Sequence, residues 1–243
     1  MTLVWAHARA ETLQLLRYPS YSVPTVALPA VFLLVFGHGL ATQAPERLLA
    51  GFAATAVLMV TFFQFGVGIA VTRATSWETF ARTLPVGPGT RLAARVLSAL
   101  GFAAATVTVV TIVTIAVFDA RPTPLQAAAL ASGLLLGGVP FALLGIALGY
   151  WLPPRAAFPA ANLVYFPLAI GGALWHRLED APRSVDVASQ LLPTRSWIEI
   201  LDPLATGERP VPLHHVGALA GWALAFGALA WFGYRRDEGE RFS

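Results

Sequence analysis

The sequence predicts an all-α membrane protein with six transmembrane helices, an N-terminal interfacial helix, and both termini in the cytoplasm. Composition supports a membrane protein, because 56% of the residues are hydrophobic and only 12% are charged, against about 25% charged residues in soluble domains. Six apolar stretches contain no Asp, Glu, Lys or Arg, and each is near or above the roughly 20 residues that a helix needs to cross a bilayer. These stretches are residues 22–41, 48–72, 96–118, 125–152, 156–175 and 216–234.

The placement of arginine sets the predicted orientation, since cytoplasmic segments of membrane proteins are enriched in basic residues. All sixteen basic residues are arginines. With six spans, the side that holds both termini carries ten arginines and five acidic residues, a net charge of +5, and the other side carries six arginines and eight acidic residues, a net charge of −2. We therefore expect cytoplasmic termini and an inner (plasma) membrane location. The basic balance follows from this topology and predicts no nucleic-acid partner.

Residues 1–21 are predicted to form an amphipathic helix that lies along the cytoplasmic membrane surface. Leu3, Ala6, Ala10 and Leu13 recur at helical spacing, and charged or polar residues occupy other positions around the helix. An ordinary frayed helix is the alternative. The segment lacks the apolar core and the small-residue cleavage site of a signal peptide, so we expect it to be retained.

The cytoplasmic loop, residues 73–95, is predicted to contain a short helix over residues 75–84. Thr75 and Glu78 have the spacing of a capping box, which starts a helix. Pro85 disfavours helix at Leu84, the residue before it. A solvated loop with a chance cap is the alternative. The helix would carry into the cytoplasm the side chains of Trp77, Glu78, Phe80 and Arg82.

Two polar residues inside the spans stand beside aromatic residues. Gln64 interrupts an aromatic run in the second span, and Asn162 comes shortly before two aromatic residues in the fifth. Such a combination makes both residues candidates for a path for an amphipathic ligand, although hydrogen bonding between helices is the commoner use of such residues. The candidate path residues are Phe62, Gln64, Phe65, Asn162, Tyr165 and Phe166.

The external loop, residues 176–213, contains an apolar segment over residues 185–200 that Pro193 divides. This pattern predicts two short helices that fold back on the membrane surface. Within the spans, pairs of glycines four residues apart allow helices to approach closely. They predict either packing within the bundle or a dimer seam, and they are Gly133 with Gly137, Gly145 with Gly149, and Gly217 with Gly221.

The chain lacks the residues that several chemistries require. Without lysine no Walker A motif can form, so the chain cannot hydrolyse ATP by that route. Without cysteine it has no thiolate or disulfide site. The five histidines form no cluster at metal-ligand spacing, and the uncharged spans disfavour an ion-coupled carrier. We therefore expect no catalytic residue, no metal site and no cofactor of its own in this chain.

An intramembrane protease is the enzymatic alternative. Ser132 in the fourth span and His214 or His215 near the sixth superficially match a serine–histidine dyad. The residues flanking this serine do not supply a G-x-S-x context, and the two histidines precede the sixth span rather than lying in it. Both features argue against this alternative.

Together these features resemble the ABC-2 family of ATP-binding-cassette transporter permeases, over essentially the whole chain. Besides length, spans and loops, the resemblance rests on Arg17-Tyr18-Pro19, Glu78, Leu84-Pro85-Val86, Thr90-Arg91-Leu92, Leu192-Pro193 and Trp197. It implies a single transmembrane domain over residues 1–243. It also implies a dimer with a second permease half, identical or not, in which each half sits on a separate ATPase subunit that holds ATP and Mg²⁺.

The resemblance makes the short cytoplasmic helix a coupling helix that transmits the movement of the ATPase to the spans. The coupling residues would be Thr75, Trp77, Glu78, Phe80, Arg82, Leu84 and Pro85. The expected function is export of a hydrophobic or amphipathic small molecule such as a drug, an antibiotic or a lipid. A permease for a polysaccharide or a haem-maturation factor is one alternative, and an ion-coupled carrier is another.

Overall fold

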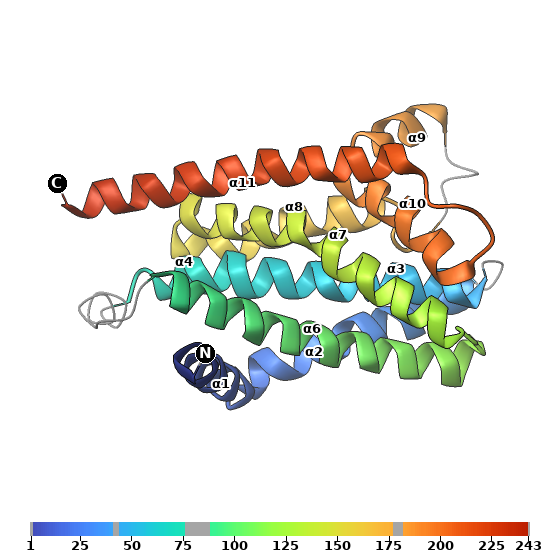
Figure 1. The fold of residues 1–243 in the computed structure, drawn as a ribbon, viewed down its shortest axis with the longest axis horizontal. Helices are drawn as coiled ribbons and strands as arrows, with labels where there is room; N and C mark the ends of the chain where they lie inside the picture. The colour runs from blue at the N-terminus through green and yellow to red at the C-terminus, as the bar shows by residue number, and fades with distance from the viewer. Residues whose placement is uncertain (1, 41–43, 76–87, 177–181, 243) are drawn as a thin grey trace.

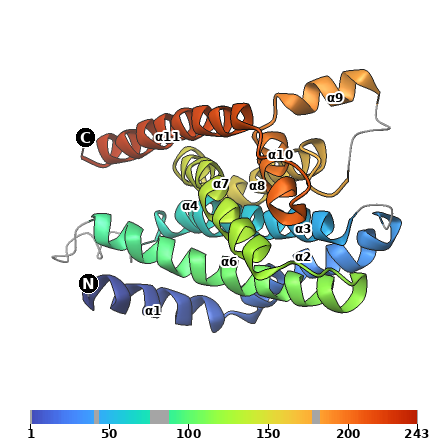
Figure 2. The same cartoon turned by 45° about the vertical axis from the view of Figure 1, so that its right-hand side comes forward.

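The structure is a computed structural model of residues 1–243, and it describes residues 2–40, 44–75, 88–176 and 182–242. Within these ranges the fold is all-helical and contains no strand. The helices lie lengthwise in one elongated bundle, with the N- and C-termini at the same end (Figures 1 and 2). We call this end the terminal end and the other the distal end. The prediction of an all-α fold is confirmed.

The bundle helices alternate between the two ends of the molecule, and the shorter helices lie at its ends or periphery. Their bounds are α1 (Thr2–Leu16), α2 (Pro19–Phe36), η1 (Gly37–Leu40), α3 (Pro45–Val60), η2 (Thr61–Val67), α4 (Gly68–Thr72), α6 (Pro88–Phe118), α7 (Pro124–Trp151), α8 (Pro154–Gly171), α9 (Arg183–Gln190), α10 (Pro193–Thr206) and α11 (Leu213–Phe242).

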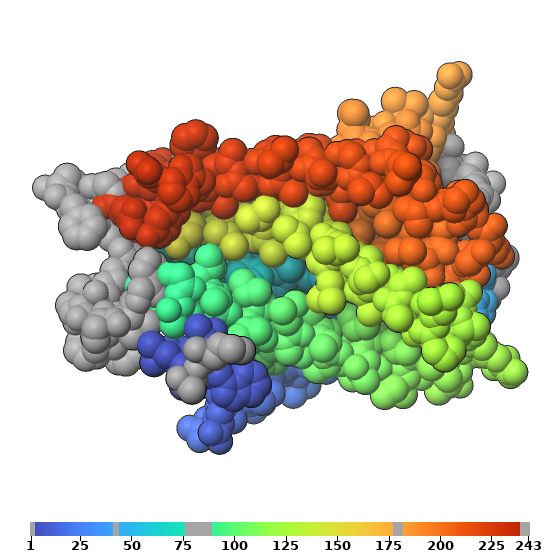
Figure 3. All heavy atoms as spheres, viewed as in Figure 1, coloured from blue at the N-terminus to red at the C-terminus, as the bar shows by residue number. Residues whose placement is uncertain are grey.

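The central element is the continuous helix formed by α3, η2 and α4. In its most apolar stretch 72% of the residues are buried, against 28% for α2, 22% for α6 and 17% for α11. On the face drawn in Figure 3, α11, α7 and α6 cover most of the surface. A helix that is apolar all round and enclosed by its neighbours forms a core, and apolar helices with exposed faces meet lipid.

Five helical segments are long and apolar enough to cross a membrane: Pro19–Leu40, Pro45–Thr72, Gly89–Phe118, Pro124–Trp151 and Leu213–Glu238. They correspond to five of the six expected spans. The remaining one, α8, has 18 residues but does not reach the same hydropathy, since it includes Arg155 and Asn162. Its helix ends at Gly171, and a turn occupies the last residues of the stretch expected to span.

Helix α1 forms as predicted, and the structure defines which side of it contacts the bundle. Ala8 is buried against the rest of the protein, and the Thr12 hydroxyl donates to Ser98 Oγ of α6 at 3.0 Å. The predicted apolar face, with Leu3 and Leu13, points outward and is exposed. An exposed apolar face beside a membrane bundle is what an interfacial helix presents to lipid.

The loop expected to be external, residues 176–213, lies at the distal end and contains two helices, α9 and α10. Pro193 is at the start of α10, as its position predicted. The expectation that both fold back on the membrane surface is wrong for α10. Trp197, Ile198 and Leu201 are fully buried, and α10 packs against α3, α7 and α11. The apolar side chains of α10 fill the space between the distal ends of those helices. This packing removes the apolar face of α10 from water.

Two of the three glycine pairs pack within the bundle. A Cβ on Gly137 would lie 2.1 Å from Trp197 Nε1, and one on Gly145 would lie 2.5 Å from the Thr61 carbonyl oxygen. These positions need glycine because another backbone or ring occupies the space. Gly217 and Gly221 on α11 have no other group within 4 Å of such a Cβ, so this pair faces outward.

Candidate translocation and coupling sites

An aromatic cluster joins η2 to α8 in the middle of the bundle. The Tyr165 ring lies 6.4 Å from the Phe62 ring, 6.4 Å from Phe63 and 5.2 Å from Phe166. Phe63 in turn lies 5.6 Å from Phe158. Phe62 and Tyr165 are buried, and Phe158 is 60% exposed. We name these five residues the aromatic cluster, which runs from the core to the outer surface of α8.

The Tyr165 hydroxyl is a polar group inside this cluster. The residue is 1% exposed, and its Oη has no hydrogen-bond partner among the described residues. A buried hydroxyl without a partner carries a desolvation cost of about 1–3 kcal/mol. Such a group is available to any donor or acceptor that enters the cluster.

The segment that supplies Phe62 and Phe63 is a π-helix. π-helical turns are rare and occur often at functional sites. Here α7 approaches so closely that the carbonyl oxygen of Thr61 would contact a Cβ at Gly145. The wider turn changes the angular spacing of the aromatic run, so Phe62 and Phe63 both face α8.

The six path candidates from the sequence fall into three locations. Phe62, Tyr165 and Phe166 belong to the aromatic cluster. Gln64 faces α6, where its Nε2 donates to Ser98 Oγ at 3.1 Å and its Oε1 has no hydrogen-bond partner. Phe65 belongs to a hydrophobic cluster that contains Ala99 and Phe102 of α6, and its Cβ lies next to Gly145 of α7.

Asn162, the remaining candidate, donates to the Phe158 carbonyl oxygen of its own helix at 2.9 Å. Sequence reasoning did not select Phe63 and Phe158 as path residues. Phe63 lay within the recognised aromatic run, and Phe158 precedes Tyr165 by seven residues, which is two helical turns. That spacing was the available signal for Phe158.

The predicted coupling helix falls largely outside the described residues. Trp77, Glu78, Phe80, Arg82, Leu84 and Pro85 all lie in the stretch 76–87, and their role stays a prediction. Thr75 is described, and its hydroxyl donates to the Thr72 carbonyl oxygen at 2.7 Å.

The residues on either side of this stretch are joined to other helices by ion pairs. Before it, Arg73 Nη1 lies 2.6 Å from Asp237 Oδ1 of α11, and Arg73 Nη2 donates to the Leu152 carbonyl oxygen at 2.8 Å. After it, Arg95 Nε lies 3.0 Å from Glu11 Oε1 of α1. The two flanks of this stretch are therefore attached to neighbouring helices, Arg73 to α11 and α7 and Arg95 to α1. The partners are too distant in sequence for local patterning to reveal them.

The distal end is closed by a buried ionic cluster around α10. Arg47 is 5% exposed, donates to the Ala173 carbonyl oxygen at 3.0 Å, and lies 3.8 Å from Asp202, itself 4% exposed. Arg209 lies 3.0 Å from both Asp202 and Glu199. The cluster ties α3 to α10 at the distal end of the bundle.

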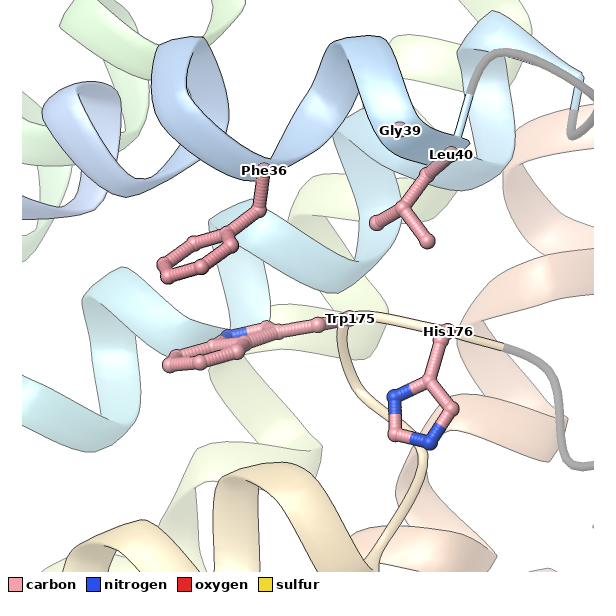
Figure 4. A pocket seen from close by; sticks show the side chains of 5 residues that line it. All are labelled: Phe36, Gly39, Leu40, Trp175 and His176. Carbon is pink, nitrogen blue, oxygen red and sulfur yellow. The ribbon is translucent and has the colours of Figure 1, made fainter.

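Beside this cluster lies a pocket lined by Phe36, Gly39, Leu40, Trp175 and His176 (Figure 4). The Trp175 indole stacks on Phe36 at a ring distance of 5.5 Å, and its N–H donates to Thr55 Oγ1 at 2.8 Å. Burial, with a smaller contribution from the positive charge of Arg47, lowers the pKa of His176 below its ordinary value of 6.5.

Among the described residues, Ser132 forms no dyad with His214 or His215. The Ser132 hydroxyl donates to the Ala129 carbonyl oxygen of its own helix at 2.7 Å. His215 Nδ1 lies 3.3 Å from Ser196 Oγ, and the rings of His214 and His215 lie 4.1 Å apart and are tilted by 40°. These contacts give no support to the protease alternative.

Several apolar helices around a buried central helix define a multi-pass membrane protein. The chain belongs to the ABC-2 type transporter family, because the model of that family matches residues 2–202. It is also 22% identical over 200 residues to a protein of Bacillus subtilis (strain 168) named "Putative transport permease YvfS", a match that covers 80% of this chain and 82% of that one. The resemblance noted from the sequence is confirmed, and the family is one of membrane transport subunits.

Proposed function

We propose that this chain is the permease subunit of an exporter for a hydrophobic or amphipathic small molecule, powered by a separate ATPase subunit. The observation that carries the choice of cargo is the aromatic cluster. Aromatic faces bind flat or apolar molecules, and the single buried hydroxyl of Tyr165 adds one polar contact for orientation. A drug, an antibiotic or a lipid has this mixed character.

Six membrane crossings are part of this proposal, with α8 as the fifth. Helix α7 ends at the terminal end and α9 lies at the distal end, so α8 carries the chain between them (Figures 1 and 2). Eighteen helical residues span about 27 Å at 1.5 Å per residue, close to the thickness of the hydrocarbon core. The richer arginine content of the terminal end supports a cytoplasmic location for it.

The energy source in this proposal is a partner chain that holds ATP and Mg²⁺. The sequence has no lysine and hence no Walker A motif. The ion pairs Arg73–Asp237 and Glu11–Arg95 support the loop 73–95 as the coupling segment, because they join both of its ends to transmembrane or interfacial helices. A second permease half, identical or not, completes the assembly.

The partner is tested by detergent pull-down of the tagged protein from its native membrane. A soluble ATPase in stoichiometric amount, lost on substitution of Trp77 and Glu78 by alanine, is the expected result. Recovery of the chain without any ATPase, with transport that collapses when the proton or sodium gradient is dissipated, would favour the ion-coupled carrier instead.

The cargo path is tested by the paired change Phe158→Ala and Phe166→Ala in proteoliposomes that contain the ATPase. Both side chains are partly exposed, so their loss leaves the core intact. We expect weaker stimulation of ATP hydrolysis by amphipathic cargo. The control is the paired change Ile112→Ala and Ile115→Ala on α6, which removes exposed apolar side chains remote from the cluster. Equal loss in both variants would argue against the path.

A further inference from the structure

The pocket lined by Phe36, Gly39, Leu40, Trp175 and His176 is a concave site that the proposed function does not use. We call it the distal pocket. Figure 4 shows Phe36 and Leu40 reaching it from the end of α2 and from η1, with Trp175 and His176 opposite them on the segment that follows α8. Its volume is about 290 Å³, and a cavity of roughly 150 Å³ already holds benzene. The distal pocket is therefore large enough for a substituted aromatic ring.

The aromatic wall of the distal pocket has a fixed position. The Trp175 indole stacks with the Phe36 ring at 5.5 Å and with the Phe52 ring at 6.1 Å, and Phe52 is fully buried. The indole N–H donates to Thr55 Oγ1 at 2.8 Å. Since these contacts are made before any ligand arrives, the wall is pre-organised, which lowers the entropic cost of binding.

Apolar surface around the opening of the distal pocket is available to a ligand. Phe36 is 46% exposed, and Leu40 is half-buried. A Cβ placed on Gly39 would meet no other described residue within 4 Å, so no described group blocks the approach there. Aromatic and aliphatic side chains with exposed surface bind flat apolar molecules. A planar ring can therefore rest against Phe36 and Leu40.

His176 supplies the polar contact at the distal pocket. The Trp175 N–H is already bonded to Thr55, whereas the half-buried His176 imidazole lines the pocket. Burial and the positive charge of Arg47 lower the pKa of His176, so at neutral pH the ring has one donor and one acceptor nitrogen. Arg47 does not line the pocket, but its charge disfavours a second cation beside it. A neutral hydroxyl suits this position better than an ammonium group.

We infer that the distal pocket binds a small neutral aromatic alcohol of the phenol class, with its ring against Phe36 and Leu40 and its hydroxyl hydrogen-bonded to His176. The hydroxyl can donate to one imidazole nitrogen or accept from the other, so either tautomer of the histidine serves. The pocket shares no residue with the aromatic cluster. Binding there therefore does not depend on what the protein transports.

The test is direct binding of para-bromophenol to the purified chain in detergent, followed by tryptophan fluorescence, because a bromine atom in contact with an indole quenches its emission. The wild type is expected to show saturable quenching, and Trp175→Phe is expected to lose the saturable part. Absence of saturable quenching in the wild type, or its persistence in this variant, would overturn the site. Neither the ATPase nor transport enters the measurement, so a failure of the proposed exporter function would leave its result unchanged.

Lining variants and a control locate the bound probe. Phe36→Ala and His176→Leu are each expected to weaken binding about fivefold or more, because one aromatic contact or one net hydrogen bond corresponds to about that factor. His176→Gln keeps a donor and an acceptor and is expected to bind more tightly than His176→Leu, which separates the hydrogen bond from a folding defect. The control, Phe232→Ala, removes a side chain of α11 that is 64% exposed and should bind as the wild type. Unchanged binding in both lining variants, or equal weakening in the control, would contradict the site.

Related probes test the chemical class of the ligand. Bromobenzene lacks the hydroxyl and is expected to bind about fivefold more weakly than para-bromophenol, the factor of one net hydrogen bond. The cation para-bromobenzylamine is expected to bind more weakly still, and tighter binding of this amine than of the phenol would overturn the proposed class. Glycerol phosphate, the headgroup fragment of an anionic lipid, is expected to displace little probe at millimolar concentration. Full displacement would indicate a lipid-headgroup site instead.

Discussion

Arg73 and Asp237 form an ion pair at 2.6 Å although they are 164 residues apart in the chain. Arg73 lies where the central helix passes into the loop of residues 73–95, and Asp237 lies near the end of α11. Through Leu152, the same guanidinium also holds the end of α7. Three helices that reach the terminal end are thus fastened at one point, next to the segment proposed to couple to the ATPase.

Asp237→Asn is expected to lower the thermal unfolding temperature of the purified protein. It removes the charge opposite a largely buried guanidinium, and a hydrogen bond to a charged group contributes about 1.5–3 kcal/mol. The control is Asp119→Asn, which breaks the exposed pair with Arg121, whose side chains are 78% and 80% exposed. Equal melting of both variants would show that the Arg73 contact contributes little.

Charge reversal in the Glu11–Arg95 pair tests whether the attraction between opposite charges, rather than the particular residue at each position, holds α1 to α6. Glu11→Arg or Arg95→Glu alone is expected to weaken the contact between α1 and α6 and to reduce the coupling of ATP hydrolysis to transport. The double reversal restores opposite charges 3.0 Å apart and should recover part of the coupling in a double-mutant cycle. Additive losses in the double variant would contradict the proposed role of this pair.

Gly137→Ala is expected to destabilise the protein, because the added Cβ would lie 2.1 Å from Trp197 Nε1. Such overpacking costs about 1–3 kcal/mol, measured by chemical or thermal unfolding in detergent. Gly221→Ala makes the same chemical change with no group within 4 Å, and we expect unchanged or slightly higher stability. A stable Gly137 variant would mean that α10 can withdraw from the bundle without cost.

Tyr165→Phe is expected to leave stability unchanged or raise it slightly, since the buried hydroxyl has no partner to lose. The contrasting change is Trp175→Phe, which removes the hydrogen bond to Thr55 and should lower stability. If Tyr165 contacts cargo, its variant will show altered cargo stimulation of ATP hydrolysis at normal stability. A destabilised Tyr165→Phe would reveal a hydrogen bond in the native protein.

His176 is expected to titrate below its ordinary pKa of 6.5, because burial and the charge of Arg47 disfavour its protonated form. The unfolded chain then binds a proton more readily than the folded one between the two pKa values, so stability falls as the pH drops through that window. Histidine-selective NMR, with His176→Gln for assignment, measures the pKa directly. A pKa at or above 6.5 would contradict the described environment.

Part of the candidate site could be predicted from residue types alone. The aromatic run around Gln64 and the pair Tyr165–Phe166 stand out in uncharged spans. Three of the predicted path residues do meet in the aromatic cluster, namely Phe62, Tyr165 and Phe166. The direction of Gln64 could not be predicted, because the π-helical turn changes which side chains share a face. A regular helical spacing does not describe that segment.

The sequence by itself determined that this is an all-helical membrane protein, since long uncharged apolar stretches form membrane-spanning helices. Its motifs also resemble the ABC-2 family, and the family match over residues 2–202 confirms that resemblance. Only the tertiary structure decided which helix forms the core, that α10 enters the bundle, and that Arg73 meets Asp237. The physical reason is that the hydropathy of a segment depends only on the residues within it, so it can be read along the chain. Burial of a particular face and pairing of distant charges depend on which helices pack together.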